Sequence, residues 1–148
     1  MDYKLIELPG TDGQMHKLAD IDKLTVLYFY PKDNTPGCTN QAIQYTAYKN
    51  EFEKLGAQII GVSRDSIKSH EKFIAKHDLN LLLLSDENSE LSDAFHVIKE
   101  KTMFGKTALG VVRSTFIIGK GGEILQEHRN VNAEADAKNM LNAIKELK

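Results

Sequence analysis

Cysteine is scarce in this chain of 148 residues and occurs once, as Cys38. A single cysteine excludes any disulfide within the chain. Long hydrophobic runs are also missing. No apolar stretch approaches the length needed to cross a membrane, so we expect no membrane association. The formal net charge is −2 and there is no block of basic residues, which argues against nucleic acid as a partner.

Targeting signals and domain boundaries are missing from the sequence as well. The first residues, Met1–Lys4, lack the charged and apolar regions of a signal peptide, so we expect a cytoplasmic protein. There is no internal repeat, linker or low-complexity tract. The length and the ordinary apolar and charged fractions are typical of one globular domain with a substantial core. We therefore predict a single domain over residues 1–148.

The chain does contain a distinctive stretch around its cysteine, Tyr28–Gln41. The β-branched and aromatic residues of Thr25–Tyr30 predict a buried strand. Apolar residues recur at helical spacing after the cysteine, and Gly56 supplies a stop for that helix. Cys38 is therefore expected in the first turn of a helix, just past a central strand. The free N–H groups and dipole of that turn favour the thiolate, which is the reactive form of cysteine.

The remaining pattern alternates strands and helices. We predict further strands at Ala57–Val62, Leu81–Leu84, Arg113–Ile118 and Glu123–His128. Helices are predicted at Thr39–Leu55, Ile67–His77, Ser89–Phe95 and Ala133–Leu147. We also predict a short hairpin from Tyr3–Leu8 and Met15–Leu18, and a long loop at His96–Val112. The inner stripe of the last helix is expected to be Ala137, Met140, Leu141, Ile144 and Leu147. This order predicts an α/β fold with a mixed sheet and helices on both faces. Sites in such sheets lie beyond the carboxyl ends of the strands, where Cys38 is expected.

The residues around Cys38 resemble a known active-site motif. Pro31, Thr35 and Cys38 have the spacing Pro-x-x-x-Thr-x-x-Cys of peroxiredoxins, and the longer string Tyr-Phe-Tyr-Pro-Lys-Asp-x-Thr-Pro-Gly-Cys-Thr resembles their bacterioferritin-comigratory-protein (PrxQ) branch. The segments Gly61–Phe73 and Arg113–Phe116 are similar to that family too, so the resemblance covers nearly the whole chain in order. It implies a thioredoxin-like fold with a mixed central sheet, flanking helices and an N-terminal β-hairpin extension.

The resemblance also implies a thioredoxin-dependent peroxidase with no cofactor and no metal. Cys38 would be the nucleophile that attacks the peroxide. The Thr35 hydroxyl can bridge the sulfur and a peroxide oxygen, because a hydroxyl donates and accepts at once. In the family, an arginine in the Arg-Ser-Thr-Phe context of Arg113 favours the thiolate and polarises the peroxide, and a guanidinium suits that role because it stays charged.

Three further positions are expected to support these residues. Pro31 and Pro36 stiffen the loop before the helix and help to keep bulk water from the sulfur. Gly37 lets the backbone approach closely, so that N–H groups near it can point at the reacting atoms.

The sequence departs from the family at two positions. Many members carry a second, resolving cysteine five residues after the first, where this chain has Ile43. A two-cysteine mechanism within one chain is therefore excluded, and we expect an external thiol to reduce a Cys38 sulfenic acid. The family usually has glutamate three residues after the nucleophile, where this chain has Gln41. A neutral amide cannot hold an arginine by charge, so the sequence leaves open how Arg113 is positioned.

Other interpretations remain open at this stage. Cys38 could be a buried small hydrophobe, Arg113 a surface residue that opens a strand, and Thr35 only a helix cap. The protein could be a non-enzymatic redox sensor or relay that forms mixed disulfides, or a binding domain with an unreactive thiol. The histidines show no metal-ligand spacing. The expected partners are a peroxide and thioredoxin, glutaredoxin or a low-molecular-weight thiol, and the expected assembly is a monomer or weak homodimer.

Overall fold

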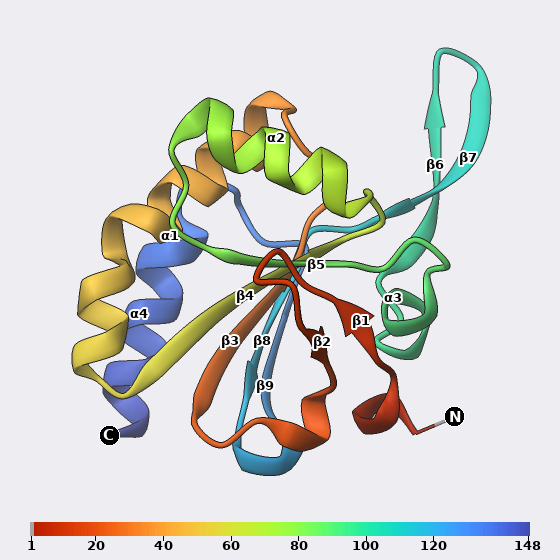
Figure 1. Cartoon of the computed structure of the whole chain (residues 1–148). Coiled ribbons are helices and arrows are strands. Elements are labelled where there is room, and N and C mark those ends of the chain that lie inside the picture. Colours follow the sequence, from red (N-terminus) through yellow and green to blue (C-terminus); the bar gives the residue numbers. More distant parts are fainter. Residues whose placement is uncertain (1) are drawn as a thin grey trace.

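The computed structural model describes residues 2–148, and its centre is a mixed β-sheet (Figure 1). Within these residues the sheet has five strands in the order β5–β4–β3–β8–β9. Their bounds are β3 (Leu24–Phe29), β4 (Ala57–Ser63), β5 (Leu82–Ser85), β8 (Ser114–Ile118) and β9 (Ile124–Arg129). Strands β3, β4 and β5 run parallel, β8 is antiparallel to β3, and β9 is antiparallel to β8.

One face of the sheet is covered by α1 (Pro36–Lys54), α2 (Ile67–His77) and α4 (Asp136–Leu147). The crossovers from β3 to β4 and from β4 to β5 step in the same direction across the sheet. Because such crossovers are right-handed, they place α1 and α2 on the same face. The core on this side is rich in tyrosine and phenylalanine, and its largest members are Tyr28, Tyr30, Tyr45, Phe52 and Phe73.

The opposite face is covered by the N-terminal segment and the short helix α3 (Glu90–Ala94). The N-terminal segment contains β1 (Leu8–Pro9), β2 (Met15–His16) and 3₁₀ turns at Tyr3–Leu5 and Leu18–Asp20. Alternate residues of the same strands point to this side, as expected for the pleat of a strand. The core here includes Leu8, Leu27, Phe29, Phe95 and Phe116, with Phe95 packed edge-on against Phe116.

The fold class predicted from the sequence is confirmed. The central strands and the long helices lie within a few residues of their predicted bounds. Two predicted details were wrong. Residues 3–5 form a 3₁₀ turn rather than part of a strand, because Asp2 caps that turn through the Lys4 N–H. Leu147 is 46% exposed and does not belong to the inner stripe of α4, since the helix ends there beyond the edge of the core.

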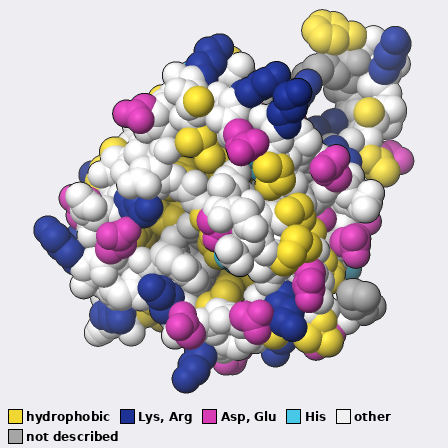
Figure 2. All heavy atoms as spheres, viewed as in Figure 1, with side chains coloured by type: hydrophobic (Ala, Val, Ile, Leu, Met, Phe, Trp, Pro, Cys, Tyr) yellow, Lys and Arg dark blue, Asp and Glu magenta, His cyan; other side chains and the backbone are white. Residues whose placement is uncertain are grey.

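The predicted loop at His96–Val112 was also wrong. It contains a hairpin of β6 (Ile98–Met103) and β7 (Lys106–Val111), which projects from the body of the molecule (Figure 1). The strands join through Phe104 and Gly105, both with positive φ, as in a type I′ turn. Most of β7 is exposed, so the sequence lacks the alternation that marks a half-buried strand. The hairpin stands clear of the rest of the surface (Figure 2). At its turn, Phe104 is 97% exposed.

Candidate active site

Cys38 lies where the sequence predicts it, in the first turn of α1. The chain leaves β3 at Phe29, and α1 begins at Pro36, a residue that suits a first helical position because it has no N–H to satisfy. The thiol is buried, with 2% exposure. It therefore sits beyond the carboxyl end of a central strand and against the positive end of a helix dipole.

Arg113 reaches the sulfur from a distant part of the sequence. It occupies the junction between β7 and β8, where its carbonyl accepts a hydrogen bond from the Val131 N–H. Its Nη1 lies 3.5 Å from Cys38 Sγ. A Cβ atom on Gly37 would come within 3.1 Å of Arg113 Nη2, so the glycine leaves room for the guanidinium beside the helix terminus. The arrangement brings a fixed positive charge to the thiol.

Gln41 connects Arg113 to the interior. Its side chain is fully buried one helical turn after Cys38, and its Oε1 accepts a hydrogen bond of 2.6 Å from Arg113 Nη1. On the other side, Gln41 Nε2 donates to Asp136 Oδ2 at 2.9 Å. The amide thus presents its oxygen to a group that only donates and its nitrogen to a carboxylate that accepts.

Asp136 is a buried carboxylate that the sequence analysis did not single out. It is the first residue of α4 and is 1% exposed. Besides Gln41, Tyr45 Oη and Thr115 Oγ1 each donate to its Oδ2 at 2.6 Å. Burial raises the pKa of Asp136, although these hydrogen bonds oppose the rise. Tyr45 belongs to the core and is also a hydrogen-bond donor in this cluster.

Thr35 and the prolines shape the loop before α1. Thr35 is the helix N-cap by its backbone, and its hydroxyl donates to the Lys32 carbonyl at 2.9 Å. It is half-buried, as is Pro31, whereas Pro36 is exposed. Ile43 lies on an outer face of α1 and is 43% exposed. Thr35 therefore closes a turn within the loop through its hydroxyl.

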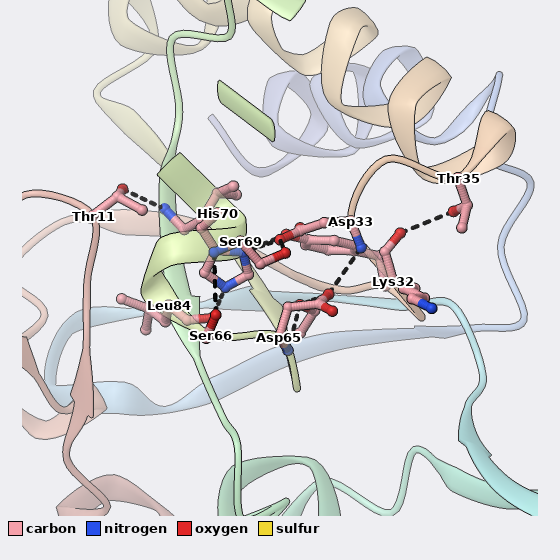
Figure 3. Close-up of polar contacts among 12 residues, drawn as sticks. Thr11, Lys32, Asp33, Thr35, Asp65, Ser66, Ser69, His70 and Leu84 are labelled. Atoms are coloured by element: carbon pink, nitrogen blue, oxygen red, sulfur yellow. Dashed lines mark hydrogen bonds and ion pairs between the residues drawn. The ribbon is translucent and has the colours of Figure 1, made fainter. Parts of the chain in front are cut away.

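A buried ion pair anchors this loop to α2 (Figure 3). Asp33 Oδ2 lies 2.7 Å from Nδ1 of His70, whose side chain is fully buried, and His70 Nε2 lies 3.0 Å from the Leu84 carbonyl oxygen. Both ring nitrogens face acceptors, one the Asp33 carboxylate and the other the Leu84 carbonyl, so the ring is held from both sides. Tyr30 Oη and Ser69 Oγ also donate to Asp33.

The loop is held by its backbone as well. The Asp33 N–H donates to Asp65 Oδ2 at 2.8 Å. Burial acts to raise the pKa of Asp33, but the bonds from His70, Tyr30 and Ser69 outweigh it and hold the pKa below its usual value. No local pattern indicates this pair, because Asp33 lies in the loop before α1 and His70 lies in α2.

The arrangement combines a buried thiol at a helix N-terminus, an adjacent guanidinium and a firmly anchored loop. It suits a thiolate that acts as a nucleophile while a fixed cation meets negative charge. Among residues 2–148 there is no cluster of three or more His, Cys, Asp or Glu side chains that could hold a metal ion. No helix in the same residues is long and apolar enough to span a membrane.

Comparisons with known proteins agree with this class of site. Residues 2–127 match the model of the AhpC/TSA family. The chain is 49% identical to peroxiredoxin Bcp of Xanthomonas campestris over 120 residues, covering 81% of this chain and 75% of that protein. It is 45% identical to peroxiredoxin Bcp of Bacillus subtilis over 143 residues, covering 96% and 91% of the two chains.

Solved structures show the same relationship. The bacterioferritin comigratory protein of X. campestris superposes with a TM-score of 0.91 at 42% identity, covering 98% of this chain and 93% of that one. The chain therefore belongs to the AhpC/TSA family, as a peroxiredoxin of its Bcp (PrxQ) branch. Its enzyme class is thiol peroxidase.

Proposed function

We propose that this chain is a one-cysteine peroxidase that reduces hydrogen peroxide and alkyl hydroperoxides through Cys38. The observation that carries the proposal is the position of the sulfur, buried in the first turn of α1 with Arg113 Nη1 3.5 Å away. The related protein of X. campestris has alkyl peroxide reduction activity. That relationship supports an alkyl hydroperoxide as one substrate of this chain.

In the first step the Cys38 thiolate attacks the terminal oxygen of the hydroperoxide. A sulfur–oxygen bond forms as the O–O bond breaks, and the other oxygen leaves with the electron pair, takes up a proton and departs as water or alcohol. Cys38 becomes a sulfenic acid. Arg113 stabilises the thiolate and the charge that develops on the oxygens. The Thr35 hydroxyl, turned from Lys32, bridges sulfur and peroxide, and N–H groups near Gly37 help to position the substrate.

In the second step a thiol from outside the chain reduces the sulfenic acid. The chain has no other cysteine, and Ile43 stands where a resolving cysteine is expected. The external thiol attacks the sulfenic sulfur, water leaves, and a mixed disulfide forms. A second thiol then releases Cys38 and carries away the disulfide. Thioredoxin, glutaredoxin or a low-molecular-weight thiol is the proposed reductant, and a monomer or weak homodimer is the proposed acting unit.

Single-turnover oxidation tests this proposal. The reduced protein is mixed with hydrogen peroxide or an alkyl hydroperoxide, and the loss of the free Cys38 thiol is followed in time. We expect rapid, stoichiometric conversion to sulfenic acid, and steady turnover once a suitable thiol is added. Oxidation no faster than that of a free thiol of similar acidity would contradict it.

A redox sensor or relay is the second candidate, favoured by the single cysteine and by Gln41 in place of glutamate. It predicts slow oxidation by peroxide and a stable mixed disulfide with a partner protein. The same single-turnover rate separates the two functions.

A further inference from the structure

The hydrogen bonds around Asp136 form a continuous path to the reactive sulfur. Asp136 Oδ2 accepts from Gln41 Nε2 at 2.9 Å, Gln41 Oε1 accepts from Arg113 Nη1 at 2.6 Å, and the same Nη1 lies 3.5 Å from Cys38 Sγ. Asp136, Gln41 and Cys38 are all buried. The path joins the first residue of α4 to the first turn of α1 through the residue that precedes β8.

The orientation of the Gln41 amide is the critical link in this path. A side-chain amide can be turned by half a rotation, which exchanges its oxygen and nitrogen. In the wrong orientation the NH₂ group of Gln41 would face the Arg113 guanidinium, so that two donors would meet. The half-buried guanidinium would then lose its acceptor. The carboxylate of Asp136 permits only the orientation that presents oxygen to Arg113, because a carboxylate accepts but does not donate.

The burial of the Asp136 carboxyl group is poorly explained by a purely structural role. A carboxylate is costly to bury, and a well-packed apolar side chain is often at least as stable in such a place. Burial raises the pKa of Asp136, which reflects this cost, and its Oδ1 has no hydrogen-bond partner within the described part of the chain. The oxygen that does have partners, Oδ2, is directed at Gln41, Tyr45 and Thr115.

We propose that Asp136 is a positioning residue for the peroxide step. Its Oδ2 holds the Gln41 amide in the orientation that keeps Arg113 against Cys38. This answers how a neutral glutamine can hold the arginine, since an acceptor oxygen one residue further along the path fixes which end of the amide faces the guanidinium. The inference rests on the proposed role of Arg113.

A double-mutant cycle tests the proposal in the full chain. Asp136→Ala removes the acceptor, and Gln41→Met removes the amide while keeping its length. We expect each to slow Cys38 oxidation by roughly tenfold or more, the scale of one hydrogen bond to a charged group. Since Asp136 acts through Gln41, the double variant should be no slower than Gln41→Met alone. Asp136→Asn still offers an oxygen at the Oδ2 position and should stay within about threefold of the unchanged protein.

A matched control separates positioning from stability. Asp86 is also a fully buried carboxylate that accepts three hydrogen bonds, from the Leu91 N–H and from the N–H and hydroxyl of Ser92, but it lies by α3. Asp86→Ala should lower the melting temperature while leaving the oxidation rate per folded molecule unchanged. If Asp136→Ala does not fold, Asp136→Ser, whose hydroxyl is too short to reach Gln41, takes its place in the cycle.

Three results would overturn the proposal. The first is an oxidation rate for Asp136→Ala within about threefold of the unchanged protein. The second is a double variant whose loss of oxidation rate equals the product of the two single losses, and the third is a loss of rate in Asp136→Asn as large as that in Asp136→Ala. Arg113→Met tests the underlying assumption separately. An unchanged rate in that variant would refute the role of Arg113 itself. A slow Arg113→Met variant with no coupling between positions 41 and 136 would refute only the role of Asp136.

Discussion

At the scale of single residues, the site depends on a few side chains whose polar partners lie far away in the sequence. Arg113 and Gln41 are 72 positions apart, and Gln41 and Asp136 are 95 positions apart. Each contact uses a buried or half-buried donor or acceptor, so the loss of one member leaves the next without a partner. Substitutions here should therefore change chemistry more than they change the fold.

Arg113→Met keeps much of the side-chain length but removes the charge and its donors. We expect the second-order rate constant of Cys38 oxidation to fall by roughly a hundredfold or more, the scale seen when one donor to a transition state is lost. The melting temperature should change little. Arg64→Met is the control, because Arg64 is another half-buried arginine, and its Nη2 donates to the Leu109 carbonyl oxygen at 3.2 Å. An equal loss of rate in both variants would contradict a specific role for Arg113.

Thr35→Val preserves the shape of the threonine and removes its hydroxyl. We expect the oxidation rate to fall by a comparable factor, roughly a hundredfold, if the hydroxyl leaves Lys32 to bridge sulfur and peroxide. If the hydroxyl serves only the turn with Lys32, the variant should lose stability and keep its rate per folded molecule. Stopped-flow oxidation and thermal melting of the same sample separate these outcomes.

At the scale of elements, the loop between β3 and α1 is fastened to α2 by the Asp33–His70 pair. His70 is fully buried and paired on both ring nitrogens. Removal of one member of a buried ion pair leaves an uncompensated charge and commonly costs about 3–5 kcal/mol. The pair therefore makes the active-site loop depend on the correct packing of α2, whereas the sulfur itself is carried by α1.

Acid should weaken this attachment. The pKa of Asp33 is below its usual value in the folded protein, so its contribution to stability is present above the ordinary aspartate pKa and is lost as pH falls through the folded value. The titratable groups that face Asp33 are His70, Tyr30 and Asp65. We expect the melting temperature of the protein to fall steeply below about pH 4.

Asp33→Asn isolates this contribution. The variant should be less stable at neutral pH, because His70 loses its charged partner, and its melting temperature should change less between about pH 5 and pH 3. Thermal melting at a series of pH values makes the comparison. Parallel acid profiles for the two proteins would show that Asp33 is not responsible.

At the scale of the whole molecule, the cysteine count decides the fate of the oxidised enzyme. After one equivalent of peroxide, the Cys38 sulfenic acid has no thiol in its own chain to react with. Reduction by an external thiol, a disulfide between two chains, and further oxidation then compete. A sulfenic acid that is resolved slowly has longer to proceed to sulfinic acid, which ordinary thiols do not reverse.

Excess peroxide without thiol should therefore inactivate the protein. Intact mass spectrometry should show two added oxygens on Cys38, and added thiol should prevent this change. Ile43→Cys should protect the activity by forming an internal disulfide. Position 43 is 43% exposed on the same helix, so the first turns of α1 must unwind locally for the sulfurs to meet. Full activity after excess peroxide, with no thiol present, would refute the overoxidation argument.

Much of the architecture can be predicted from local patterns along the chain. The β-branched and aromatic run Thr25–Tyr30 and the helical spacing after Cys38 predicted a strand followed by a helix. The structure has both, as Leu24–Phe29 and Pro36–Lys54. These features are local, because hydrophobic periodicity and caps act within one element. The β6–β7 hairpin was missed because its exposed strands show no such periodicity, and its turn uses Phe104 and Gly105 rather than Asn-Gly.

The contacts between side chains of different elements could not be predicted in this way. The motif named Cys38, Thr35 and Arg113 as members of one site, but it left open what holds the arginine when position 41 is an amide. The answer lies in Asp136, which reaches Gln41 only because α4 packs against α1. Such contacts depend on how separate elements pack, and a pattern along one element carries no information about the polar group that the next element brings against it.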